Sequence, residues 1–233
     1  MKYIRKANER GKVDFGWLRS AHSFSCGSYY DVNHMGVSAL RVINDDIVEP
    51  ARGFDTHGHK DMEIISYVVS GALEHKDSSG NQYIVPEGDI QIMSAGKGIM
   101  HSEYNASKEE TVNFLQIWIQ PNQKGGAPRY GQKKIEQTET LTPLITSDGR
   151  NGTLSILQDA QMSRLILGSG ESFSFEPENR VGYLHIVKGS LVTEEGALGP
   201  GDAVGVTQEV LAVKADTPVE ALWFDLPPVE DAH

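Results

Sequence analysis

Disulfide bonds and long apolar segments are missing from this chain of 233 residues. Cys26 is the single cysteine, so no intrachain disulfide can form, and a reducing compartment is expected. No run of apolar residues approaches the roughly 18 that a membrane helix needs. The basic residues near the N-terminus are not followed by the apolar run of a secretory signal. These absences predict a cytoplasmic protein.

Positive charge is also scarce. The chain carries 21 Lys and Arg residues against 32 Asp and Glu residues, which gives a formal net charge of -11. A surface this negative repels phosphate groups. We therefore expect neither direct binding to nucleic acid nor docking on anionic membranes as a main activity.

Helical periodicity is weak, whereas turn residues are abundant, with 24 Gly and 10 Pro. Short runs of Val, Ile, Leu and Tyr recur between the turns. Examples are IISYVV at 64–69, IQIM at 90–93, VNFLQIWI at 112–119 and LHIV at 184–187. Evenly spaced short strands with turn signals predict an all-β fold, either a barrel or a sandwich.

The chain contains an internal repeat. Three pairs of segments match in the same order: VSGAL at 69–73 with VKGSL at 187–191, PEGD at 86–89 with GPGD at 199–202, and LQIWIQP at 115–121 with LWFDLP at 222–227. Ordered matches predict two copies of one β-unit. We place the domains at 1–130 and 131–233, with the polar, turn-rich residues 122–134 as the connection. A monomer is expected, because two domains can bury their faces against each other.

Only the first copy keeps its histidines. Aligning Gly71 with Gly189 carries His57 and His59 to Phe175 and Pro177. Aligning Gly88 with Gly201 carries His101 and Glu103 to Lys214 and Asp216. Metal chemistry is therefore predicted in the N-terminal domain alone.

Two pairs of candidate ligands stand two residues apart, His57 with His59 and His101 with Glu103. Residues i and i+2 of a strand point to the same face, so each pair can converge on one point. Three imidazoles and one carboxylate suit a divalent first-row metal. Four protein ligands leave up to two positions open, whereas a closed structural zinc site would more often use cysteines.

Glu63 leaves the ligand set open. On a regular strand it would share the face of His57 and His59, as would Asp61. Glu63 can replace Glu103 as a ligand, accept a hydrogen bond from a ligand imidazole, or act as a base. Glu103 is preferred because His101, two residues before it, is already a ligand. A solvated or hydrogen-bonded role is expected for Asp61.

Two longer motifs carry a family resemblance. Residues 53–75 (GFDTHGHKDMEIISYVVSGALEH) and 86–105 (PEGDIQIMSAGKGIMHSEYN) resemble the two motifs of a cupin, in the variant typical of the pirin family. The segments GWLRSAHSFS at 16–25 and LRVINDD at 40–46 are similar to the opening of that family. Gly58, where proline is common, departs from the pattern without removing a ligand.

The resemblance implies two tandem cupin barrels, a bicupin, with a degenerate second barrel. It implies a metal, Fe(II) in most members, held by His57, His59, His101 and Glu103. Purified protein can instead carry Zn, Ni, Cu, Mn or Co, because affinities follow ligand chemistry and metal supply.

Some bacterial pirins resemble quercetin 2,3-dioxygenases, which open the central ring of flavonols with O₂ and release carbon monoxide. The resemblance thus implies a metal-dependent dioxygenase whose partners are O₂ and a flavonol or related small phenol. Glu103 or Glu63 would take the proton of the substrate hydroxyl. The alternative is a non-enzymatic sensor of metal or redox state that binds a protein partner, as vertebrate pirins imply. A third option is a metal that only braces the fold.

Several other side chains carry weaker expectations. Phe54, Met93, Met100 and Ile117 are candidates to line the cavity, and the barrel core is the alternative place expected more often for any one of them. His34, His75 and His185 lack partners on the same strand face, so we place them on surfaces or turns. The three tryptophans, Trp17, Trp118 and Trp223, are expected in the core.

Overall fold

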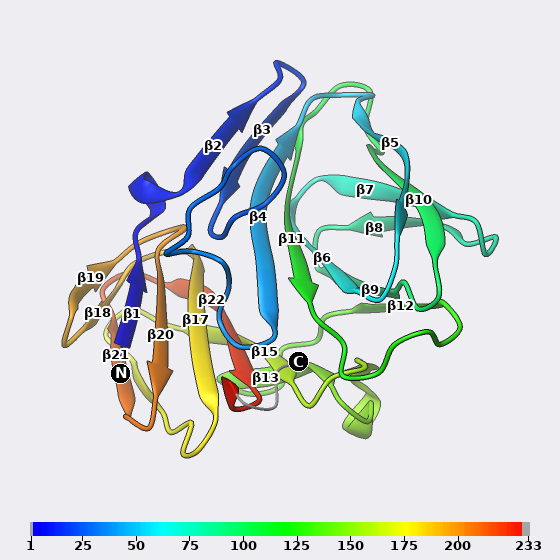
Figure 1. Cartoon of the computed structure of the whole chain (residues 1–233). Helices are drawn as coiled ribbons and strands as arrows, with labels where there is room; N and C mark the ends of the chain where they lie inside the picture. The colour runs from blue at the N-terminus through cyan, green and yellow to red at the C-terminus, as the bar shows by residue number, and fades with distance from the viewer. Residues whose placement is uncertain (1, 230–233) are drawn as a thin grey trace.

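The computed structural model describes residues 2–229, and these form a nearly all-β protein of two barrels (Figure 1). The predicted fold class is confirmed. Each barrel consists of a sheet of seven strands facing a sheet of four. Almost all neighbouring strands are antiparallel, the exception being the short β13–β14 pair. Two 3-10 turns, η1 (Ala7–Glu9) and η2 (Arg150–Gly152), complete the secondary structure of this part of the chain.

The N-terminal barrel carries all the predicted metal ligands. In spatial order its larger sheet contains β12 (Arg129–Lys134), β9 (Asp89–Ser94), β6 (Glu63–Ser70), β11 (Val112–Ile119), β4 (Leu40–Val48), β3 (Leu18–His22) and β2 (Gly11–Asp14). Its smaller sheet contains β5 (Gly53–His59), β10 (Ile99–Asn105), β7 (Ala72–Asp77) and β8 (Gln82–Pro86).

The C-terminal barrel has the same numbers of strands in its two sheets, which confirms the predicted internal repeat, and it differs at one edge, where β14 is parallel to β13 while β2 is antiparallel to β3. Its larger sheet contains β1 (Lys2–Arg5), β20 (Ala203–Thr207), β17 (Val181–Lys188), β22 (Val219–Leu226), β15 (Gln161–Leu167), β13 (Leu141–Thr146) and β14 (Leu154–Ser155). Its smaller sheet contains β16 (Ser172–Phe175), β21 (Leu211–Ala215), β18 (Leu191–Thr193) and β19 (Gly196–Leu198).

Strand β1 belongs to the C-terminal barrel although it lies near the N-terminus. It pairs antiparallel with β20, from Lys2 opposite Val206 to Arg5 opposite Ala203. In Figure 1 the dark blue β1 lies beside the orange β20. The equivalent position of the N-terminal barrel is taken by β12, which lies within the stretch predicted as a connection and pairs with β9. The division at residues 130 and 131 stays a prediction, and its outer limits, 1 and 233, fall outside the described residues.

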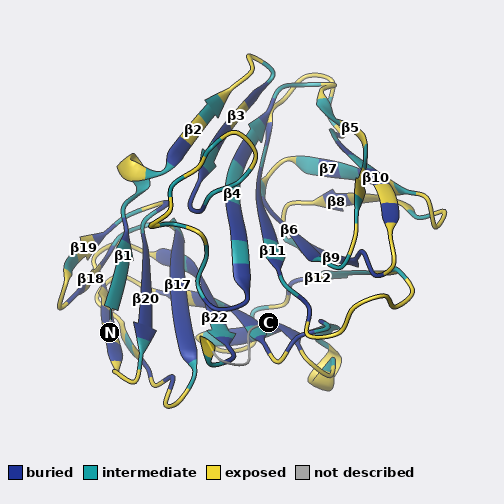
Figure 2. Cartoon of the chain, in the orientation of Figure 1, coloured by how far each residue is buried: buried dark blue, intermediate teal, exposed yellow. Residues whose placement is uncertain are grey.

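A shared apolar core joins the two barrels. Ile43, Ile65 and Ile117 of the N-terminal barrel pack in one buried cluster with Tyr183 and Phe224 of the C-terminal barrel. Figure 2 shows the strands at this junction in the colour of buried residues. Within residues 2–229 no helix has the length and apolar character that crossing a membrane requires.

The interior of the C-terminal barrel is an apolar cluster, and within residues 2–229 the one group of side chains that could hold a metal lies in the other barrel. Leu211, Val213 and Ala215 are buried on β21, and the rings of Phe175 and Trp223 stack with centroids 4.0 Å apart. The sequence alignment had matched His101 and Glu103 with Lys214 and Asp216, which are exposed. That register was wrong by one residue, because shifts between the Gly-Asp turn and this strand cannot be seen in the repeat. The second copy has no imidazole on β16 or β21, the strands equivalent to those that carry the candidate ligands, although it does contain His185 on β17.

Candidate metal centre and its cavity

Three histidines converge inside the N-terminal barrel. His57 and His59 lie on β5 and His101 lies on β10, directly opposite His57 in the antiparallel register. One ligand atom from each of the three lies within 4.8 Å of the others. The ring centroids are 4.5–4.8 Å apart. The i, i+2 spacing therefore brings His57 and His59 together as predicted, because both lie on β5.

The arrangement fits a metal ion. The Nε2 atoms of His57 and His101 are 3.0 Å apart, and two nitrogens about 2.1 Å from one metal at right angles would lie about 3 Å apart. The Nδ1 atom of His57 bonds the carbonyl oxygen of Asp55 at 2.7 Å, which leaves Nε2 as the ligand atom. The buried Nε2 of His59 has no hydrogen-bond partner within the protein. A metal would satisfy it.

The protein keeps the imidazoles of His59 and His101 neutral, as metal binding requires. Burial, followed by the neighbouring His101 and His57, lowers the pKa of His59 to about 4. Burial, followed by His57 and His75, lowers the pKa of His101 to about 3. At neutral pH their ring nitrogens have lone pairs to offer.

Glu103 is buried beside the histidines and is held by two side chains. The Ser66 hydroxyl donates to Oε1 at 3.1 Å and the Gln116 amide donates to Oε2 at 2.6 Å. The carboxylate is not part of the 4.8 Å cluster. An irregularity in β5 accounts for the offset: His101 faces His57, whereas Glu103, two residues on, faces Phe54.

Glu63 does not share a strand with the histidines, so that expectation was wrong. Strand β5 ends at His59 and β6 begins at Glu63. Between them Asp61 adopts a left-handed backbone with φ 48°, and its carboxylate accepts a hydrogen bond from the amide of Gly125. Such a turn breaks the alternation of side chains. The Glu63 carboxylate accepts bonds from the hydroxyl of Ser94 and the amide of Leu157.

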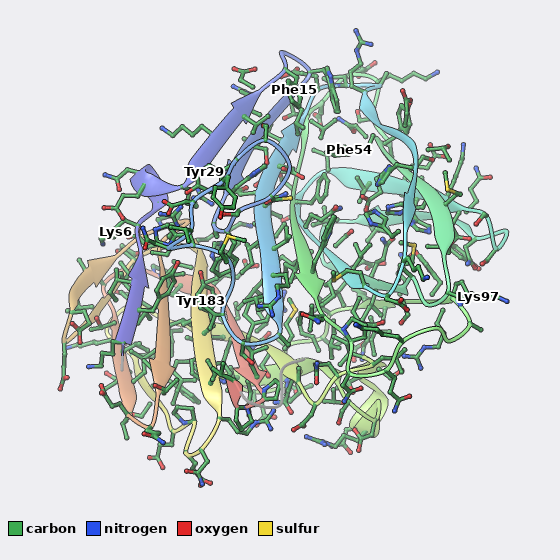
Figure 3. The ribbon with its side chains drawn as sticks, in the orientation of Figure 1. Lys6, Phe15, Tyr29, Phe54, Lys97 and Tyr183 are labelled. Carbon is green, nitrogen blue, oxygen red and sulfur yellow. The ribbon has the colours of Figure 1, made fainter. Side chains whose placement is uncertain are left out.

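A cavity of about 250 Å³ opens beside His57 and His59. Its apolar lining includes Phe15, Phe54 and Trp118. Figure 3 shows Phe15 at the tip of the β2–β3 hairpin, where 63% of its surface is exposed. The Trp118 ring meets that of His59 edge to face at 5.0 Å. An aromatic wall of this kind suits a flat aromatic ligand.

The four candidates for the cavity lining lie in three different places in the structure. Phe54 does line the cavity. Met93 and Ile117 are fully buried in the apolar core, and Met100 is exposed in a separate depression with Gly58. Phe54 therefore takes the cavity role, whereas Met93 and Ile117 take the alternative core role, and strand parity alone could not tell the two apart. Trp118 also belongs to the cavity wall and not to the core alone.

Polar residues at the cavity were missed in the sequence. Cys26, Asn44, Asp46 and Gln116 all line it. Asp46 is 3% exposed, and burial, partly offset by the Ser20 hydroxyl that donates to it, raises its pKa to about 7. Burial also raises the pKa of the Cys26 thiol. The alternation of β3 and β4, which turns residues 20, 22, 44 and 46 inward, was the available signal.

Two histidines predicted on surfaces are buried instead. His75 bonds the Asp77 carboxylate through Nε2 at 2.8 Å, and its ring centroid lies 5.5 Å from that of His101. His185 lies on β17, where burial lowers its pKa to about 4. For His75 the sequence did hold a sign, because Asp77 stands two residues away on the same face of β7. For His185 no such partner was visible within the strand.

Comparisons with known proteins agree with this architecture. The family model described as Pirin matches residues 3–119, and the one described as Quercetinase C-terminal cupin domain matches residues 144–226. A quercetin 2,3-dioxygenase of Escherichia coli strain K12 is 46% identical over 232 residues, covering 98% of this chain and 100% of that protein. A pirin-like protein of Caulobacter vibrioides is 40% identical over 222 residues, covering 92% of this chain and 95% of that protein.

Solved structures show the same likeness. The crystal structure of the bacterial pirin YhhW from Escherichia coli in complex with nickel(II) superposes with a TM-score of 0.94. It shares 45% sequence identity, and the match covers 98% of this chain and 100% of that one. A relative of this similarity therefore binds a divalent metal.

Proposed function

The chain belongs to the pirin family of bicupins, and on that premise we propose that it is a metal-dependent dioxygenase acting on small phenols, with flavonols such as quercetin as the test substrate. The observation that carries the proposal is the convergence of His57, His59 and His101 at the wall of an aromatic-lined cavity. The relatives named quercetin 2,3-dioxygenase support it.

His57, His59, His101 and Glu103 are the residues proposed to hold the metal. A divalent metal bound there supplies Lewis acidity that stabilises negative charge on a substrate oxygen. Fe(II) is the proposed native ion, because three imidazoles and one carboxylate suit it. Ser66 and Gln116 orient the Glu103 carboxylate by donating to both of its oxygens.

The remaining residues bind the substrate and exclude water. Phe15, Phe54 and Trp118 would hold an aromatic ring against the histidines. The cavity is slightly smaller than the roughly 300–1,000 Å³ of common ligand pockets, so a flavonol would extend past the exposed Phe15 toward solvent. We assign Glu63 to joining the barrels, since its partner Leu157 lies in the C-terminal half.

The test is oxygen consumption with quercetin, using protein stripped of metal and reloaded without O₂ with either Fe(II) or Ni(II). We expect O₂ uptake matched by carbon monoxide release. The His101→Ala variant should bind little metal and lose this activity, because it removes one of the three converging nitrogens.

Protein with stoichiometric metal that consumes no O₂ with quercetin or simpler phenols would refute the enzymatic proposal. Metal content has to be measured on each sample, so that an empty site is not mistaken for an inactive one. Ser102→Ala, which changes a side chain between His101 and Glu103, is the control for damage to β10.

The second candidate, a metal-responsive protein that binds a partner, has one observation in its favour. Tyr30, Val32 and Met35 expose apolar side chains on the segment between β3 and β4. The same segment supplies Cys26 to the cavity wall, so the state of the site could alter this surface. Tight partner binding by protein that turns over no phenol would favour this function.

A further inference from the structure

The cavity beside the histidines contains one carboxylate, that of Asp46, among the residues the structure describes as lining it. Asp46 lies on β4, across the barrel from the strands that carry the histidines. Its inward direction follows from the alternation of β4, whose even-numbered residues Asn44 and Asp46 reach the cavity. A ligand in the cavity therefore has His57 and His59 on one side and Asp46 on another.

The two carboxylates predicted from sequence are less suited to accept a substrate proton. Both oxygens of Glu103 already accept hydrogen bonds, from Ser66 and Gln116. Glu63 is engaged by Ser94 and Leu157. A general base has to lie within hydrogen-bond reach of the proton it takes, and neither residue lines the cavity.

The surroundings of Asp46 suit a group that gains and loses a proton. Its Oδ1 accepts a hydrogen bond from the Ser20 hydroxyl. Burial is the largest effect on the carboxyl, and the negative charges of Glu103 and Asp45 add to it, so that its pKa rises to about 7. A base works best when its proton affinity matches the working pH.

We propose that Asp46 is the catalytic base that takes the proton from the phenolic hydroxyl of the bound substrate. The O–H bond of the substrate breaks and a new O–H bond forms at Oδ2 of Asp46, while Oδ1 stays bonded to Ser20. The products of the step are a substrate anion and a neutral carboxylic acid, with no proton released to solvent. This inference rests on the proposed function.

The test is anaerobic binding of quercetin to Ni(II)-loaded protein, in weak buffer just above neutral pH. Two signals are followed together: the absorption shift of the flavonol on ionisation, and the release of protons to an indicator dye. Wild-type protein should show the shift without proton release. Asp46→Asn should either bind the neutral flavonol without a shift or release one proton for each anion bound.

Asp45→Asn is the matched control. Asp45 is the residue before Asp46 on β4 and points outward, where Arg10 and Asn113 bond its carboxylate. This variant removes the same charge from the same strand and should still show the absorption shift without proton release, with the pKa of Asp46 moved down because the negative charge of Asp45 no longer raises it. Asp46→Glu should recover the internal transfer in part, since it restores a carboxylate.

Kinetics supply a second readout. Without its base the enzyme should lose at least roughly 100-fold in kcat, while KM and metal content change little. An Asp46→Asn protein that still ionises quercetin without proton release would overturn the proposal and point to Glu103. Failure of wild-type protein to bind quercetin at all would refute the proposed function together with it.

Discussion

Ser66 and Gln116 face each other on β6 and β11, and the corresponding pair in the C-terminal barrel is Leu184 and Trp223. The first pair holds the Glu103 carboxylate, whereas Trp223 stacks on Phe175 and fills the interior. Loss of the imidazoles was thus accompanied by loss of the polar groups around them. An apolar replacement is favourable once no charge has to be held, because a buried polar group without partners is costly.

Removing the Gln116 amide should weaken the metal site. In Gln116→Leu one oxygen of the buried Glu103 loses its donor, and loss of such a supporting hydrogen bond typically lowers metal affinity about 10–100-fold. Competition with a coloured chelator measures the change in Kd. Gln132→Leu alters an amide on β12 and should leave Kd unchanged. Equal affinities in wild type and Gln116→Leu would contradict the role assigned to Gln116.

His185 should make the metal-free protein sensitive to acid. Burial, followed by the positive charge of Arg10, lowers its pKa to about 4 in the folded state, while the unfolded chain keeps about 6.5. Between these values the unfolded state binds more protons, so the free energy of unfolding falls as pH falls from about 6.5 to about 4.

In His185→Leu the decrease in the free energy of unfolding over this pH range should be smaller by on the order of 2–3 kcal/mol. Urea unfolding of both metal-free proteins across this pH range measures the difference. The comparison isolates His185, because the histidines of the metal centre titrate in both proteins. Parallel curves would show that His185 is already protonated in the folded state, or that its surroundings adapt.

The segment between β3 and β4 is the element that forms the pocket wall, and β1 of the other barrel holds it. Arg5 is buried, and its guanidinium donates to the carbonyl of Ser23 and the hydroxyl of Tyr29. Figure 3 shows Tyr29 on this segment, close to the N-terminal strand. The main-chain amide and carbonyl of Cys26 form hydrogen bonds with those of Tyr29. The reactivity of the Cys26 thiol can therefore be used to measure how firmly this segment is held.

Alkylation of Cys26 should speed up when the Arg5 contact is removed. Arg5→Met eliminates charge-assisted hydrogen bonds that are buried, which should raise the rate roughly tenfold. Tyr29→Phe, which removes only the acceptor hydroxyl, should give a smaller increase. Lys6→Met, the next residue, is the control. Identical rates in all four proteins would mean that packing alone holds the wall.

At the scale of single strands, the sequence predicted the side-chain directions that follow from alternation within a strand. It did not predict which strands lie opposite each other across the barrel. His57, His59 and His101 were found because i and i+2 share a face. Glu63 was misplaced because the left-handed residue Asp61 ends the strand before it. Asp46 was not recognised, since an acidic residue in LRVINDD becomes a cavity residue only when β4 faces β5 across the barrel.

The whole molecule is held by a core that belongs to both barrels. Tyr67 of β6 also donates a hydrogen bond to Glu220 of β22 across the junction. A ligand that binds only the folded state stabilises every part that unfolds with its site. Metal in the N-terminal barrel should therefore stabilise the C-terminal barrel as well.

Hydrogen exchange measures this coupling. Adding Ni(II) to the metal-free protein should slow amide exchange in β17 and β22, and not only in β5 and β10. The His101→Ala variant, which should bind little metal, should show no such change. Slowing confined to the N-terminal barrel would mean that the two barrels open independently.

The pairing of β1 with β20 sets an order of events during synthesis. Residues 2–5 emerge from the ribosome long before their partners at 203–206. Until then the first strand has no edge to join, and unpaired strands invite association with other chains. The N-terminal barrel can close earlier, because β12 fills its corresponding edge. Nascent chains should therefore gain a metal site well before β1, the strand that carries Arg5 to the cavity wall, is paired with β20.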